Sequence, residues 1–324
     1  MTTTLAEKAV LRAAKKQKAE ERKKRLARLL SSAKKDYDEE IYRLNKDLLA
    51  AARRLSRSDV RFLVDLYYQL QDRRIRVAGQ LRSSEGEPNA LMSYFFAQDA
   101  ALESDAGKAL LTYAREWTVG QWCMSICGIA GIITSGLLAH LDIRKAPYAG
   151  NFFSFAGLSP GVKWEKGQKR PWNADLKCLA AFKAGECLIK VQNNPKDVYG
   201  KVYAKEKALL TERNERGEFK ARAALELATK KFSEDSDAVE HLRAGRLRPI
   251  HIHEWARRVA VKLFLSHLHY AMHLDFHGKP PPNPYVFEHG EGHHHFIEPP
   301  HIGIIKKAEG RPLSEMYRDE RSVS

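Results

Sequence analysis

Apolar residues recur every three or four positions between residues 41 and 126, with one polar interruption. From Ile41 to Leu81 they form a single heptad-like stripe, which predicts one long amphipathic helix. The segment Ser83–Asn89 contains a glycine and a proline and predicts a turn. A second stripe runs from Leu91 to Ile126. Two long helices with a short turn between them predict an antiparallel helical hairpin, a coiled coil.

The remainder of the chain is also patterned for helices, and no segment alternates as a strand would. Residues 201–231 predict a charged helical pair broken at Asn214–Gly217, and Ile250–His277 predicts an amphipathic helix after a polar connector, residues 233–249. Prolines then end helix formation. We predict an all-α chain in four parts. These are a basic N-terminal segment (1–35), the coiled-coil hairpin (36–126), a compact helical domain (127–277), and a Pro/Gly/His-rich tail (278–324) lying extended over the surface or in solvent.

The chain is strongly basic. The 324 residues carry a formal net charge of +15, which favours a polyanionic partner, nucleic acid before an anionic membrane. No apolar run reaches the roughly 18 residues that span a bilayer, and the longest candidate, Met124–Leu141, is broken by glycines, serines and a histidine. The N-terminus lacks the apolar core of a secretory signal. We therefore expect a cytoplasmic protein without a membrane partner, its four cysteines reduced.

The predicted hairpin implies an interaction between copies of the chain. Two helices cover each other's apolar surface only in part, and a second copy would cover the remainder. The alternative is that the hairpin packs on the C-terminal half of its own chain. We expect a homodimer.

Two glycine-punctuated turns, Gly128–Gly131 and Gly157–Gly161, each join apolar segments. Glycines before a helix start let backbone amides approach a phosphate, so helix, glycine turn, helix predicts a helix-hairpin-helix grip on a nucleic-acid backbone. The second turn leads into a segment that we call the basic loop (residues 163–177). Its candidate contacts are Lys163, Trp164, Lys166, Lys169, Arg170, Trp172, Asn173 and Lys177.

Cations in the basic loop can neutralise phosphates, and an exposed indole can stack on an unpaired base. The alternatives are a solvated face for the cations and core packing for one of the two tryptophans. A second basic strip lies on the last predicted helix, after Arg246 and Arg248. It comprises Arg257, Arg258 and Lys262, of which the last two share a helix face.

Histidines suggest a metal site as an alternative. His269, His273 and His277 share a helix face, and His289 and His293–His295 follow; such spacing suits zinc. The glutamate of a metalloprotease motif and nearby cysteines are missing, and core packing or RNA contact explains histidines equally well. Acidic residues lie mostly on exposed helix faces without strands to array them for a nuclease. We therefore expect no metal, no other cofactor, no catalytic residues and no enzymatic activity.

Three segments resemble a known family when taken in order. They are GIAGIITSGLLA, FAGLSP and PWNADLK, which are similar to the C-terminal helical domain of RNA-guided insertion-sequence transposases. That family carries a nucleophilic serine in a Ser-Gly pair where this chain has Lys166-Gly167, and an acidic RuvC-like domain where this chain has basic helices. Ser159 lies inside the turn motif and does not match the nucleophile position.

A long helical hairpin leading into a small helical RNA-binding domain resembles the Nop-domain proteins of box C/D ribonucleoproteins. The Tas proteins of TIGR-Tas systems, found in prokaryotes and phages, join both resemblances. Four blocks are similar to sequences of that group: VRFLVDLYYQLQDRRIR, WEKGQKRPWN, VYGKVYAKEKALLTERN and RRVAVKLFLSHLHYAMH. The resemblance implies a Nop-like domain and a homodimer that presents a short guide RNA to double-stranded target DNA. Some members fuse a RuvC or HNH nuclease, and neither is evident here.

Three functions therefore stay open. The first is a guide-RNA-binding protein that forms a homodimeric ribonucleoprotein for RNA-guided DNA targeting without intrinsic nuclease activity. The second is a transposase or recombinase of the RNA-guided insertion-sequence type, and the third is a nucleoid-like DNA binder. A discrete copurified RNA would indicate the first, strand-exchange products the second, and random DNA the third.

Overall fold

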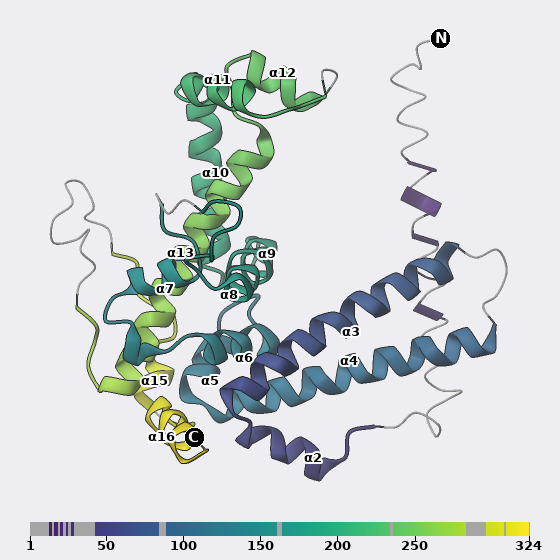
Figure 1. Cartoon of the computed structure of the whole chain (residues 1–324), viewed down its shortest axis with the longest axis vertical. Coiled ribbons are helices and arrows are strands. Elements are labelled where there is room, and N and C mark those ends of the chain that lie inside the picture. Colours follow the sequence, from purple (N-terminus) through teal and green to yellow (C-terminus); the bar gives the residue numbers. More distant parts are fainter. Residues whose placement is uncertain are drawn as a thin grey trace. The chain divides into compact units, whose positions relative to one another are not determined.

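The structure is a computed structural model that describes residues 43–83, 89–160, 164–233, 236–282, 296–307 and 309–323, with isolated positions between 13 and 28. Most of the predicted basic segment, residues 1–35, lies outside this part. The described residues form helices and one isolated bridge, with no strand among them, so the all-α prediction is confirmed. They group into two compact units (Figure 1). We call residues up to 55 together with 61–112 the arm, and residues 56–60 together with those from 113 onward the body.

The arm contains two long helices that lie side by side (Figure 1). Its elements are α2 (Lys46–Ala51), η1 (Ala52–Arg54), α3 (Arg57–Ser83), whose first turn belongs to the body, and α4 (Ala90–Glu116), whose last residues do. Arg73 Nε pairs with Asp99 at 2.9 Å, and Arg74 pairs with Glu103. Phe96 packs into a buried cluster with α3 residues. These contacts join the second half of α3 to the first half of α4, an antiparallel arrangement.

The prediction of one long helix from residue 41 to 81 is wrong for the first third of this segment, which is separate from α3. The helical segment before Leu55 ends, and α3 starts afresh two residues later. Ser56 and Asp59 explain the interruption, because the Ser56 Oγ accepts from the Asp59 amide at 3.2 Å and the Asp59 carboxylate accepts from the Ser56 amide at 3.1 Å. This reciprocal pair is a capping box, which satisfies amides that a new helix leaves unpaired.

The second predicted helix is also shorter than expected, since α4 ends at Glu116 and not at Ile126. Trp117 forms a parallel bridge with Arg311. In that bridge the Arg311 amide donates to the Glu116 carbonyl at 2.8 Å and the Thr118 amide donates to the Arg311 carbonyl at 3.0 Å. Backbone groups that would have continued the helix are therefore paired with a distant segment.

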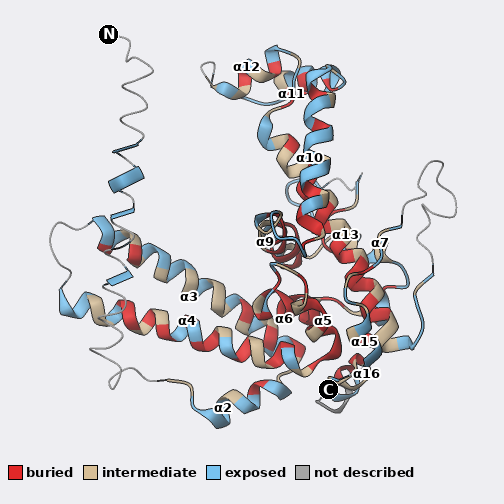
Figure 2. Cartoon of the chain, turned by 180° about the vertical axis from the view of Figure 1, so that it is seen from behind, coloured by how far each residue is buried: buried red, intermediate tan, exposed pale blue. Residues whose placement is uncertain are grey.

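The body is built around one long helix, α13 (Pro249–His277), which packs against α5, α7, α9 and α10. Buried residues run along α5, α6 and α13 (Figure 2). The other body elements are α5 (Thr118–Met124), α6 (Gly131–His140), η2 (Ile143–Lys145), α7 (Ala149–Phe155), α8 (Ala174–Lys177), the π-helical η3 (Cys178–Ala184), α9 (Gly185–Lys190), α10 (Tyr199–Glu215), α11 (Lys220–Thr229), α12 (Asp237–Arg243), α15 (Gly303–Lys307) and α16 (Leu313–Val323). Within the described residues, no helix has the length and apolar character needed to cross a membrane.

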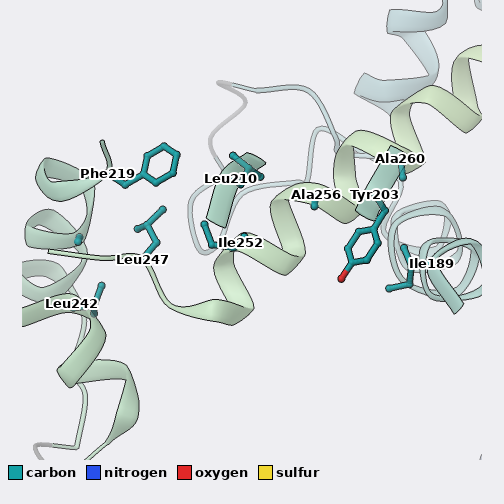
Figure 3. Close-up of a cluster of buried hydrophobic side chains, with 10 residues drawn as sticks. Ile189, Tyr203, Leu210, Phe219, Leu242, Leu247, Ile252, Ala256 and Ala260 are labelled. Atoms are coloured by element: carbon teal, nitrogen blue, oxygen red, sulfur yellow. The ribbon is translucent and has the colours of Figure 1, made fainter. Parts of the chain in front are cut away.

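One end of the body forms a small assembly that we call the outer lobe, made of α10, α11, α12 and the first turns of α13. Its core contains the side chains of Leu210, Phe219, Leu242, Leu247 and Ile252 (Figure 3). The predicted charged helical pair is confirmed as α10 and α11, separated by a turn around residue 217.

The predicted polar connector over residues 233–249 is corrected, because it contains α12. Val239 and Leu242 are buried in that helix. Gly245, with φ +72°, ends it in the left-handed conformation typical of a helix C-terminus. The Arg246 amide donates to the His241 carbonyl at 3.0 Å, as in a Schellman motif. Buried apolar side chains therefore hold a helix in this strongly polar segment.

A buried carboxylate ties the outer lobe together. Glu226 of α11 accepts hydrogen bonds from Lys230 Nζ at 2.7 Å and from Arg248, and its other oxygen lies 3.2 Å from His251 Nδ1. Although burial acts to raise it, these bonds lower the pKa of Glu226 to about 2. Glu226 is therefore ionised and fully paired at neutral pH, which links α11 to the start of α13.

The expectation of an extended tail is also corrected. Residues 303–307 and 313–323 form α15 and α16, and Leu313, Met316 and Tyr317 are buried in the body. The Trp122 indole donates to the Pro300 carbonyl at 2.8 Å. The Asp275 carboxylate accepts from the Leu313 amide at 2.7 Å. Gly278, with φ +69°, ends α13 ahead of the prolines, and the prolines did not prevent the chain from returning to complete the core.

His267, His269 and His273 of α13 are buried in that core, whereas His277 is exposed. His267 lies between the Tyr199 hydroxyl and the Ile297 carbonyl, at 2.8 Å from each, and burial lowers its pKa to about 4. His269 Nε2 lies 2.8 Å from the Ala146 carbonyl. Among the described residues, no group of three His, Cys, Asp or Glu side chains is placed to hold a metal. His289 and His293–His295 lie outside the described residues.

Candidate nucleic-acid interface

The first glycine turn connects α5 to α6, as the helix, turn, helix prediction requires. Gly128 has φ +86°, and a Cβ there would meet the Cys187 carbonyl oxygen at 2.5 Å. Only glycine therefore fits at this close approach to α9. Gly131 is the first residue of α6 and is buried. Gly128 is exposed and Gly131 is not, so the two predicted contacts are not equally accessible.

The second glycine turn ends a helix where a helix start was predicted. Gly157, with φ +63°, follows α7. The Gly157 amide donates to the Ser154 carbonyl at 3.1 Å, and the Leu158 amide donates to the Phe153 carbonyl at 2.8 Å. These are the two bonds of a Schellman motif. The amides expected to face a phosphate are therefore used to close α7, and Gly161 lies outside the described residues.

The basic loop is exposed from Trp164 to Pro171. The Trp164 indole donates to the Gln168 carbonyl at 2.7 Å, which closes a short turn, and the Arg170 guanidinium lies 5.1 Å from the centre of the Trp164 ring. Lys166 and Lys169 are exposed on the same turn. The structure thus brings these four residues together, and Lys163 lies outside the described residues.

The second tryptophan of the loop has a structural role. Trp172 packs against Gly157 so closely that a Cβ on Gly157 would meet Trp172 Cγ at 2.7 Å, and Lys177 Nζ lies 4.4 Å from the Trp172 ring centre. Asn173 caps α8, its side-chain oxygen accepting from the Leu176 amide at 2.8 Å. The expectation that one of the two tryptophans packs inward fits Trp172, which is half-buried.

The second basic strip, which lies on α13, differs from the prediction at one residue. Arg257 is only 4% exposed and forms ion pairs with Glu186 and, at 2.5 Å, with Glu254. It is therefore not available to a phosphate. Arg258 is exposed and Lys262 is half-buried. Burial, followed by the charge of Arg258, lowers the pKa of Lys262.

Helix α7 connects the basic loop to the α13 strip. The Asn173 amide donates to the Phe155 carbonyl at 3.0 Å, and Lys262 Nζ lies 5.8 Å from the Phe153 ring centre. The two predicted basic segments therefore flank one short helix, although about 90 residues separate them in sequence. We call the accessible cations around α7 the basic face; they are Lys166, Lys169, Arg170, Lys177, Arg258 and Lys262.

Sequence reasoning missed the exposed phenylalanines of this region. Phe155 on α7 is 43% exposed and Phe182 on η3 is 46% exposed. Both lie in apolar runs that predict core positions, so nothing in the pattern marked them. Aromatic rings beside cations are typical of surfaces that bind single-stranded nucleic acid.

Among the described residues, the hydrogen-bond partner of Ser159 is another serine. Its hydroxyl lies 2.9 Å from the Ser154 hydroxyl, so the hydrogen bond that the structure describes is to another neutral group. An activated serine needs an adjacent general base.

Comparison of the chain with protein-family models, with curated proteins and with solved structures finds no match.

Proposed function

We propose that this chain is a guide-RNA-binding protein of the Tas type, in which a Nop-like helical body holds a short guide RNA. Base pairing by the guide would then select a double-stranded DNA target, without cleavage by the chain itself. The proposal rests on the sequence resemblance to Tas proteins and on the basic face. The arm corresponds in it to the coiled-coil hairpin of that architecture.

The observation that carries the proposal is the exposed turn of the basic loop. Arg170 stacks on the half-exposed Trp164 ring, and Lys166 and Lys169 lie on the same turn. A guanidinium held against an indole keeps its N–H groups directed for phosphate oxygens while losing little side-chain freedom on binding. Stacked and point-like cations side by side are suited to a polynucleotide backbone.

Such contacts fix the position of a nucleic acid without reading its sequence. Lys and Arg bind phosphates, whereas base edges are read chiefly by bidentate Arg, Asn and Gln contacts in a groove. The side-chain amides of the basic loop form hydrogen bonds within the chain. Asn173 caps α8, and Gln168 Nε2 donates to the Glu165 carboxylate at 3.2 Å. A protein of this kind needs pairing by its bound RNA to acquire sequence specificity.

The decisive experiment is to purify the full chain from its expression host at low salt and to sequence the nucleic acid that remains bound. A discrete short RNA species, sensitive to ribonuclease, is the expected result. Random DNA fragments would contradict the proposal. Strand-exchange products formed by the same preparation on paired donor and target DNA would support the transposase alternative.

The proposed homodimer is tested on an apolar stripe of α4. Leu91, Phe95 and Leu102 are 60%, 49% and 44% exposed, and their spacing of four and seven places them on one helix face. We expect wild-type protein to sediment as a dimer and the variant Phe95→Glu/Leu102→Glu to sediment as a monomer. The control is Leu225→Glu, an exposed leucine of the outer lobe (64%). A wild-type monomer, or an unchanged dimer in the variant, would show that this stripe is not the dimer contact.

A further inference from the structure

The helix that follows the basic loop contains a π-helical turn, Cys178–Ala184, between α8 and α9. A π-helical turn accommodates an extra residue in a helix and is often found at functional sites. Leu179, Ala180 and Ala184 of this turn are buried, and the turn packs against α6 and α13. Phe182 is directed outward and is 46% exposed. A large aromatic ring is thus held at the surface by a turn whose leucine and alanine side chains are in the core.

The ring of Phe182 is supported from beneath by a buried cation. The Arg257 guanidinium lies 4.9 Å from the ring centre. Glu186 and Glu254 hold that guanidinium in place through ion pairs. Gly185 makes room for it, since a Cβ there would meet Arg257 Cγ at 3.2 Å. One side of Phe182 therefore rests on a fixed group, and the exposed remainder is available to a ligand.

The position of this ring relates it to the basic face. Arg257 and Arg258 are consecutive on α13 and point about 100° apart. Phe182 covers Arg257. Arg258 is exposed and lies one turn before Lys262, which contacts Phe153 of α7. On its own helix, Phe182 follows Lys177 of the basic face by five residues. A strand held by these cations would pass close to the ring.

The charge beside the ring decides what it can bind. The Arg257 guanidinium beneath the ring is already paired with Glu186 and Glu254, so it is not available to a phosphate. A neutral base, in contrast, has a π-face that stacks on an aromatic ring whatever its identity. We propose that Phe182 stacks on an unpaired base of the bound RNA, so that the RNA is single-stranded where it crosses this turn. The inference rests on the proposed function and adds that the RNA segment bound by the basic face is single-stranded.

The test compares a single-stranded RNA carrying the fluorescent base 2-aminopurine with a duplex RNA of equal length. Phe182→Leu keeps an apolar cover over Arg257 but removes the stacking surface. Loss of one stacking contact weakens binding by about 5- to 150-fold. For Phe182→Leu we expect this loss of affinity for the single strand, together with reduced quenching of 2-aminopurine fluorescence. The salt dependence of binding should be unchanged, and so should the affinity for the duplex. Phe182→Trp should bind the single strand as wild type does.

Phe62→Leu, which alters a phenylalanine of α3 that is 71% exposed, is the matched control and should bind as wild type. Wild-type affinity of Phe182→Leu for the single strand would overturn the stacking proposal, even if basic-loop variants weaken binding and so leave the proposed function intact. Equal weakening for single strand and duplex, with a lower melting temperature, would show that Phe182 only covers Arg257. Failure of the wild-type protein to bind any RNA would overturn the proposed function itself.

Discussion

Replacing Lys166, Lys169 and Arg170 together with alanine is expected to weaken RNA binding about a hundredfold at 0.1 M salt. Each phosphate contact releases counterions and contributes about 0.7 to the log–log salt slope for a single strand, which corresponds to roughly fivefold in affinity per contact at that salt. The three side chains are exposed on one turn, so their removal should leave the fold unchanged. Titrations of labelled RNA at several salt concentrations give both the affinity and the slope.

The matched control removes the same charge from another surface. Lys205, Lys231 and Arg243 are exposed on the outer lobe, and their triple alanine variant lowers the net charge equally. It should retain most of the affinity and most of the slope. If both triple variants lose the same affinity, the chain attracts RNA by its overall charge, and the basic loop is not a distinct site.

Replacing Glu226 with alanine is expected to destabilise the outer lobe by about 3 kcal/mol, because the mostly buried Arg248 and His251 lose the carboxylate with which they are paired. The side chains of Glu226, His251 and Arg248 are 5%, 16% and 25% exposed. Lys230 is 54% exposed and returns to water, which limits the loss. Amide hydrogen exchange in α10 and α11 measures the free energy of opening of this lobe.

The same carboxylate predicts a dependence on pH. The pKa of Glu226 is about 2 in the fold against an ordinary value of 4.5. A lowered pKa stabilises the fold above the unfolded value, and this contribution is lost as pH falls from about 4.5 to about 2. This contribution to the acid sensitivity of the outer lobe should be absent in Glu226→Ala. Glu212→Ala, which removes a carboxylate that is 62% exposed beside Arg216, should change stability by less than about 0.5 kcal/mol; a loss as large as that of Glu226→Ala would contradict the role of burial.

Local patterns predicted the long helices and missed the contacts that end them. Three-four spacing of apolar residues identified most of α3, α4 and α13, although Leu91, Phe95 and Leu102 of the α4 stripe are exposed. The charged pattern of residues 201–231 identified α10. The end of α4 is set by the bridge between Trp117 and Arg311, which no local pattern contains. The restart at Ser56 was recognisable in principle, because Ser56 and Asp59 have capping-box spacing.

The candidate site shows the same division. Exposure of the basic loop followed from its composition, and the structure places Trp164 and Arg170 together. The burial of Arg257 depends on Glu186, which is 71 residues away in sequence. A glycine such as Gly157 is found both before helix starts and after helix ends, so the residue type alone did not show which of the two it marks. Side-chain partners distant in sequence therefore decided which predicted residues are accessible.

The return of the C-terminal segment to the core has a consequence for synthesis. The Tyr113 hydroxyl reaches Met316 Sδ at 3.9 Å across 203 residues. At ribosomal rates of 5–20 residues per second, that interval takes about 10 to 40 s. During that time the nascent body exposes the apolar surface that α15 and α16 later cover. The described contacts within the arm join helices that are close in sequence, so it can form on the ribosome. Chaperones are therefore expected to engage the body of the growing chain more than its arm.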